Sequence, residues 1–130
     1  MIVLDASATF DLLADVGDDG RWVDDQIASE REWHTPEIVD PEVLQALRRR
    51  MARGEISSDE AEEIVESLVT APLARYPHLP LVARAWELRG QLTAYDAMYV
   101  ALAEALGATL VTTDRRLARA ATTVDVAAPS

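Results

Sequence analysis

The chain has 130 residues, 49% hydrophobic and 27% charged, which is typical of one globular domain spanning residues 1–130. Its 23 acidic and 12 basic residues give a net charge of −11, which argues against a basic surface that binds polyanions. Cysteine is absent and every basic residue is arginine, which excludes disulfides, thiol nucleophiles, a Walker A lysine and Schiff-base chemistry. The apolar runs are too short for a signal peptide or a membrane span, so we expect a cytoplasmic protein with no membrane partner.

The N-terminal part predicts short strands separated by helices. Residues 1–4 form an apolar run typical of a buried parallel strand, and residues 8–14 predict a helix. Residues 17–20 are expected to form a loop before a second helix at about 22–31, and residues 33–36 predict a strand closed by proline.

Two consecutive helices follow. Asp40 is the expected N-cap of the first, with Pro41 and Glu42 in its first turn and Gly54 at its end. Ser57 to Glu60 predicts a capping box for the second. The apolar residues expected to face inward are Val43, Leu44, Leu47 and Met51 on the first helix and Ile64, Val65, Leu68 and Val69 on the second.

The C-terminal part continues the alternation. The expected elements are an edge strand 73–76, a helix that begins at Pro80 and ends at Gly90, a helix 93–106, a strand 109–112, a helix 115–121 and a strand 123–127. Strands separated by helices favour a mainly parallel sheet with helices on both faces. We therefore expect a three-layer α/β/α domain.

Acidic residues stand where such a sheet binds ligands, beyond the carboxyl ends of its strands. Asp5 and Asp114 directly follow strands, and Glu42 and Asp96 lie in the first turns of helices. Four uncompensated carboxylates would repel one another, and a divalent cation removes this conflict. Without cysteine and with only two histidines, hard oxygen ligands favour Mg²⁺ or Mn²⁺, the usual setting of metal-assisted phosphodiester cleavage.

Four segments resemble the successive motifs of PIN-domain ribonucleases of the VapC toxin type. They are Met1 to Ala8, Thr35 to Arg49, Thr93 to Glu104 and Leu110 to Ala118, in the family's order over nearly the whole chain. The resemblance implies that Asp5, Glu42, Asp96 and Asp114 are the catalytic, metal-binding acids.

The same resemblance implies hydroxyl groups that orient these carboxylates, a substrate and a partner. Ser7 and Thr112 are the implied orienting hydroxyls. The implied activity is a Mg²⁺- or Mn²⁺-dependent endoribonuclease toxin that cleaves RNA and is blocked by a cognate antitoxin. The apolar faces of the helices at 41–53 and 58–69 leave room for the antitoxin or for a homodimer contact.

Two alternative functions stay open at the level of sequence. A haloacid-dehalogenase-like phosphatase also places an aspartate after its first strand, but needs a second one where this chain has Ser7. A catalytically inactive PIN binding module would be favoured by the loss of one of the four acids, and all four are present.

Arginines near the acids are candidate phosphate contacts, although solvated helix faces explain them equally well. The two clusters are Arg48, Arg49, Arg50 and Arg53 beyond Glu42, and Arg115, Arg116 and Arg119 beyond Asp114. Trp22, Trp33 and Trp86 are expected in the core or an interface rather than as base-stacking platforms.

Overall fold

The computed structural model describes residues 1–14 and 17–130 and contains a parallel sheet with strand order β3-β2-β1-β4-β5. Its strands are β1 (Ile2–Leu4), β2 (Trp33–Pro36), β3 (Leu73–Tyr76), β4 (Thr109–Val111) and β5 (Val126–Ala127). Because β1 and β4 are neighbours at the centre, the segments that follow them emerge side by side at one edge of the sheet.

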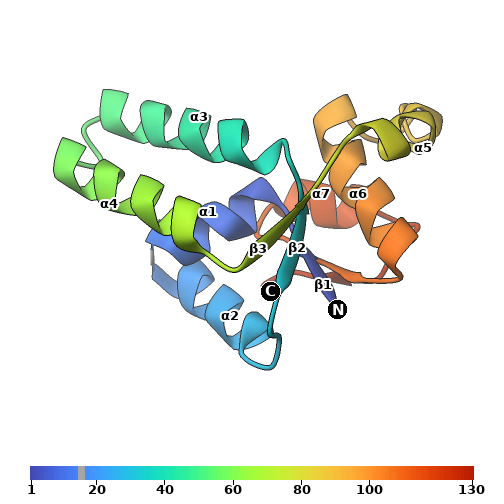
Figure 1. Ribbon diagram of the computed structural model, residues 1–130, viewed down its shortest axis with the longest axis horizontal. Helices are drawn as coiled ribbons and strands as arrows, with labels where there is room; N and C mark the ends of the chain where they lie inside the picture. Colours follow the sequence, from blue (N-terminus) through green and yellow to red (C-terminus); the bar gives the residue numbers. More distant parts are fainter. Residues whose placement is uncertain (15–16) are drawn as a thin grey trace.

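Helices cover both faces of this sheet, as Figure 1 shows, with α1 to α4 on one side and α5 to α7 on the other. The helices are α1 (Ala6–Ala14), α2 (Gly17–Ile27), α3 (Val39–Ala52), α4 (Ser58–Thr70), α5 (Val82–Glu87), α6 (Ala94–Leu106) and α7 (Arg115–Ala120), with a 3₁₀ turn η1 at Leu79–Leu81. The expected three-layer α/β/α fold is confirmed. None of these helices is long and apolar enough to cross a membrane.

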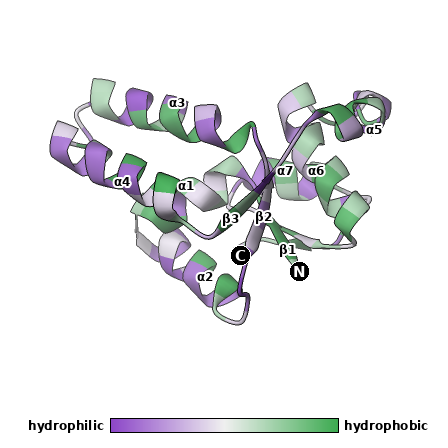
Figure 2. Cartoon of the chain, viewed as in Figure 1, coloured by the Kyte–Doolittle hydropathy of each residue, from purple (hydrophilic) through white to green (hydrophobic). Residues whose placement is uncertain are grey.

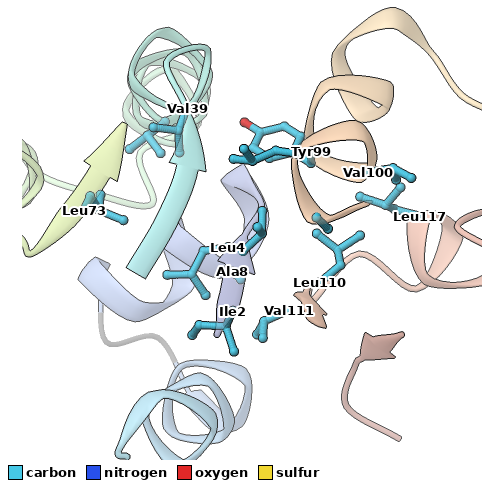
Figure 3. Packing of buried hydrophobic residues seen from close by; sticks show 14 of the residues in the cluster. Ile2, Leu4, Ala8, Val39, Leu73, Tyr99, Val100, Leu110, Val111 and Leu117 are labelled. Carbon is cyan, nitrogen blue, oxygen red and sulfur yellow. The ribbon is translucent and has the colours of Figure 1, made fainter. Parts of the chain in front are cut away.

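The core lies between the central strands and the two helix layers. Val3, Leu4 and Leu110 are fully buried, and β1 is hydrophobic along its length in Figure 2. Figure 3 shows Leu4 and Leu110 between the helix layers, with Tyr99 of α6 lying over them. Burial on both sheet faces is what the continuous apolar run at residues 1–4 predicts.

Several local predictions were wrong, each for a physical reason. Gly17 to Gly20 is the first turn of α2 rather than a loop, where Asp18 and Asp19 complement the helix dipole. The α3 helix begins at Val39, one residue before Asp40, with Ile38 as its N-cap, and the Ile38 N–H donates to His78 Nε2 (3.0 Å). Asp40 instead accepts two hydrogen bonds from Arg75.

The helix after β3 and the apolar faces of α3 and α4 also differ from the predictions. Pro80 lies in the 3₁₀ turn η1, and the α-helix after it ends at Glu87, before Gly90. The predicted inward positions are correct for Val43, Leu47, Ile64 and Leu68, which are buried, whereas Leu44, Met51, Val65 and Val69 are exposed. Trp86 is 66% exposed and so does not lie in the core. Of the two locations expected for it, an interface is the one that its exposure allows.

Candidate active site

One cavity at the carboxyl edge of the sheet brings all four predicted acids together. It has a volume of about 370 Å³ and is lined by Asp5, Ala6, Ser7, Phe10, Asp11, Glu42, Ala46, Arg49, Arg50, Asp96, Tyr99 and Asp114. Asp5 and Asp114 follow the adjacent strands β1 and β4, while Glu42 and Asp96 come from the first turns of α3 and α6. The cavity is therefore the meeting point of four chain segments.

Asp5 is the most buried of the four acids, with 3% of the residue exposed. It accepts hydrogen bonds from the Ser7 hydroxyl (2.8 and 2.9 Å), the Thr112 hydroxyl and the backbone N–H of Ala8 (2.8 Å). Ser7 also accepts from the Thr113 N–H (3.2 Å), so the turns after β1 and β4 are joined through this one carboxylate.

All these donors are neutral, and they do not outweigh the cost of burying the charge. Burial raises the pKa of Asp5 to about 7, the hydrogen bonds from Thr112, Ala8 and Ser7 oppose the shift, and the negative charge of Asp114 adds to it. Near neutral pH, Asp5 is thus a partly protonated acid that a nearby cation would return to its charged form.

Glu42 is held by the hydroxyl of Tyr99, which donates to its Oε1 at 2.6 Å. Burial raises the pKa of Glu42, the Tyr99 hydrogen bond opposes this, and the charge of Asp96 adds to it. The pKa of Tyr99 is itself raised, first by burial and then by its contact with Glu42, so it remains a hydrogen-bond donor. Figure 3 shows Tyr99 on α6, the helix that also carries Asp96.

Asp96 and Asp114 share a single arginine. Arg116 donates from Nη2 to Asp96 (2.8 Å) and to Asp114 (3.3 Å). Asp114 is also the N-cap of α7, accepting at Oδ1 from the N–H groups of Arg116 (2.9 Å) and Leu117 (3.2 Å). Nearby Thr93 caps α6 by accepting from the Asp96 N–H (3.1 Å), which fixes where that helix begins.

The four acids share a cavity, but their side chains do not converge on one point. Within residues 1–14 and 17–130, no group of three or more acids or histidines is close enough to hold a metal ion. Each carboxylate contacts a protein donor: Asp5 contacts hydroxyls, Glu42 contacts Tyr99, and Asp96 and Asp114 contact Arg116.

Two residues of the site were not expected from the sequence. Asp11 is a fifth carboxylate on the cavity wall and accepts from the Thr113 hydroxyl at 2.6 Å. Its position one helical turn beyond Ser7 is the signal that could have found it. Tyr99 likewise lies three residues after Asp96 on the same helix, and this helical spacing brings it to the side of α6 from which its hydroxyl reaches Glu42.

Only some of the arginines in the two clusters line the cavity. Arg49 and Arg50 line it, with the guanidinium of Arg50 stacked 5.0 Å from the Phe10 ring. On the same helix, Arg48 donates to Gln45 and lines a different surface groove. In the second cluster, Arg115 pairs with Asp19 at 3.8 Å.

Comparison with known proteins gives a consistent picture. The PIN domain family matches residues 2–122. VapC ribonuclease Mb0985 of Mycobacterium bovis is 44% identical over 117 residues, which are 90% of this chain and 88% of that protein. Two solved structures share the fold: VapC20 of Mycobacterium tuberculosis, a sarcin-ricin loop cleaving toxin, and VapBC2 of Rickettsia felis bound to a DNA fragment from their promoter.

The structural matches are extensive although their sequences have diverged. VapC20 has a TM-score of 0.71 at 18% identity, covering 92% of this chain and 95% of that one. VapBC2 has a TM-score of 0.68 at 16% identity, covering 98% of both chains. These two matches establish a common fold. The chain belongs to the PIN-domain family, in the group of the VapC proteins.

The burial of Asp5 predicts how the stability of the metal-free protein depends on pH. Because its pKa is about 7 in the folded protein and 3.8 for an ordinary, solvated aspartate, Asp5 favours the folded state most when protonated. Its contribution is complete below about pH 4 and is lost as the pH rises to 7, a change of up to about 4 kcal/mol. Chemical denaturation in EDTA from pH 4 to 8 measures this change.

Asp5→Asn should remove most of that dependence and make the protein more stable at pH 8. Asp125→Asn, on an exposed acid that lies away from the cavity, controls for the change in net charge. An Asp5→Asn protein whose free energy of unfolding still falls between pH 4 and 7 as in the parent would contradict this assignment of the pH dependence to Asp5.

Proposed function

We propose that the protein is a metal-dependent endoribonuclease that acts as the toxin of a toxin-antitoxin pair. The observation that carries this is the single cavity that joins Asp5, Glu42, Asp96 and Asp114. The relative at 44% identity is a VapC ribonuclease and covers nearly the whole chain, which supports RNA as the substrate.

The chemistry of the residues present fits a hard divalent cation, and the acids would have to move closer together than in the metal-free protein to share one ion. The donor set consists of carboxylates alone, and burial and mutual repulsion raise the pKa of both Asp5 and Glu42. Such a site gains free energy when a cation takes the place of protons, and oxygen ligands favour Mg²⁺ or Mn²⁺. Asp5, Glu42, Asp96 and Asp114 would hold it.

The chemistry that Mg²⁺ or Mn²⁺ supplies when bound is a lowered pKa of water and compensation of the charge that develops on the phosphate. The chain's own residues orient the acids. Ser7 and Thr112 fix both oxygens of Asp5, and Tyr99 fixes one oxygen of Glu42. Orienting groups of this kind reduce the reorganisation needed when substrate binds.

Asp96→Asn should lower RNA cleavage by at least about 100-fold, since partners that merely orient metal ligands already contribute about 10- to 100-fold. Asp125→Asn should leave cleavage unchanged. Total RNA incubated with Mg²⁺, Mn²⁺ or EDTA, followed by mapping of the cleaved ends, measures both the activity and its metal requirement. Full activity in Asp96→Asn, or equal activity in EDTA, would refute the proposal.

Arg49 and Arg50 are the best-placed phosphate contacts, because they lie on the wall of the cavity that holds the acids. The planar guanidinium suits phosphate oxygens, and the two side chains follow Glu42 by two helical turns on α3. They offer a local positive surface on a protein whose net charge is −11.

The arginines of α3 and of its C-cap, Arg53, provide a matched comparison. In a Glu42→Gln background that slows cleavage, replacing Arg49 and Arg50 together by Gln should reduce the slope of log affinity for RNA against log salt by about 1.4. Replacing Arg48 and Arg53 by Gln changes the net charge equally but should leave the slope closer to its original value. Equal effects of the two pairs would show that the cavity arginines have no special role.

The site offers little support to the two alternatives. In a haloacid-dehalogenase-like phosphatase a second aspartate would stand at position 7, where Ser7 here donates to Asp5 instead. An inactive binding module would have no need to retain four acids whose repulsion raises the pKa of two of them.

Two exposed apolar surfaces lie at opposite ends of the molecule in Figure 1. The α3–α4 groove, of about 410 Å³, is lined by Leu44, Leu47, Arg48, Met51, Ser58, Ala61, Glu62 and Val65. The η1–α5 surface exposes Leu79, Val82 and Trp86. We assign the groove to an amphipathic segment of the antitoxin and the η1–α5 surface to a homodimer contact, because a groove between two helices suits a peptide.

Substitutions that introduce a charge can distinguish the roles of the two surfaces. Trp86→Glu places a charge in the η1–α5 surface and should convert a dimer to a monomer in sedimentation velocity. Val65→Glu in the α3–α4 groove should leave the dimer intact. A dimer that is disrupted only by Val65→Glu would reverse the assignment, and a monomeric parent protein would exclude a homodimer.

A further inference from the structure

Arg116 makes an unusual contact for a side chain on the surface. One nitrogen, Nη2, donates to Oδ2 of Asp96 on α6 and to Oδ2 of Asp114 before α7. Both acids line the cavity, and Arg116 itself remains 57% exposed. Its guanidinium therefore reaches from solvent to the rim of the site and connects two acids that are 18 positions apart in the chain.

The local structure explains why Arg116 reaches these oxygens. Asp114 uses Oδ1 to cap α7, accepting from the N–H groups of Arg116 and Leu117. Oδ2 of Asp114 is then left for a cation. Because Arg116 is in the first turn of the helix that Asp114 caps, its side chain is tethered close to that oxygen.

Arg116 also has a distinct electrostatic role. Among the arginines that the structure describes, Arg116 alone forms ion pairs with any of the four acids. Arg49 and Arg50 line the cavity but pair with none of them there, and Arg50 pairs with Glu55. The charge of Asp96 and Asp114 is thus compensated locally by one side chain.

The contact differs from the ion pairs that hold the fold together. Arg75 binds Asp40 through two nitrogens, Nε (2.8 Å) and Nη2 (2.9 Å), and Arg84 binds Glu104 in the same two-nitrogen manner. Arg116 uses one nitrogen for two acids and is more exposed than either of these arginines. A pair of that kind is weak and opens readily.

We propose that Arg116 is a tethered counter-cation, which holds Asp96 and Asp114 in the metal-free protein and must leave them when a divalent cation binds. This inference rests on the proposed metal site, because the guanidinium and the cation compete for the same carboxylate oxygens. Arg116 is then a positioning residue that limits the affinity of the site for metal and keeps the acids together before metal arrives.

Binding of Mn²⁺ alone, measured by calorimetry without RNA, tests the proposal. Arg116→Gln should bind Mn²⁺ roughly two- to fivefold more tightly than the parent, the range expected when an exposed ion pair no longer has to break. Arg119→Gln, on the same helix, changes the net charge equally and should alter the affinity less. Thermal unfolding gives a second readout.

In EDTA, Arg116→Gln should unfold about 1 to 4 °C below the parent, because the acids lose their counter-charge. With saturating Mg²⁺ the two proteins should unfold at similar temperatures. If Arg116→Gln does not fold, Mg²⁺ titration of the ¹⁵N-arginine-labelled parent should show one guanidinium signal moving to the position of a free arginine.

Unchanged or weaker Mn²⁺ binding by Arg116→Gln, or an arginine spectrum that Mg²⁺ does not alter, would overturn the proposal. So would an affinity gain that Arg119→Gln matches, since that would reflect net charge alone. None of these measurements involves RNA cleavage. Absence of cleavage would therefore contradict the proposed function without affecting this test.

Discussion

The burial of one carboxylate, Asp5, is the constraint on which the rest of the site depends. It is the first residue after the central strand β1, and its oxygens receive hydrogen bonds from both the β1–α1 and β4–α7 turns. Ser7 and Thr112 supply those bonds, and Thr112 also accepts from the Asp114 N–H at 3.0 Å. Thr112 thus links the positions of Asp5 and Asp114 at this edge of the sheet.

Burial of this charge has consequences for stability and function together. The neutral donors around Asp5 leave its pKa near 7, and the raised pKa of Glu42 shows the same conflict on another wall of the cavity. At the more exposed rim, Arg116 compensates Asp96 and Asp114. A divalent cation would compensate the negative charge of all four carboxylates, which protons and Arg116 compensate separately in the metal-free protein. The burial and repulsion that destabilise the metal-free protein therefore favour metal binding.

The sequence predicts the element order and the meeting of the four acids at one edge of the sheet, because strand-end and helix-start positions are local features. The sequence predicts less well the features that depend on tertiary contacts. Asp40 does not cap α3 because it binds Arg75, which is distant in the chain, and the exposure of Val65 and Val69 depends on how α4 packs on α3. The pairing of Arg116 with Asp96 likewise joins α6 and α7, 20 positions apart, which no local pattern encodes.

The central claim is that buried acids exchange protons for a divalent cation, and counting those protons tests it most directly. Mn²⁺ binding measured by calorimetry in buffers of different ionisation enthalpy gives the number released at each pH. Because the pKa of Asp5 is about 7, we predict release of a substantial fraction of a proton at about pH 6.5 that declines toward zero by about pH 9 and is reduced in Asp5→Asn. Binding without proton release at the lower pH, or release that Asp5→Asn leaves unchanged, would contradict it.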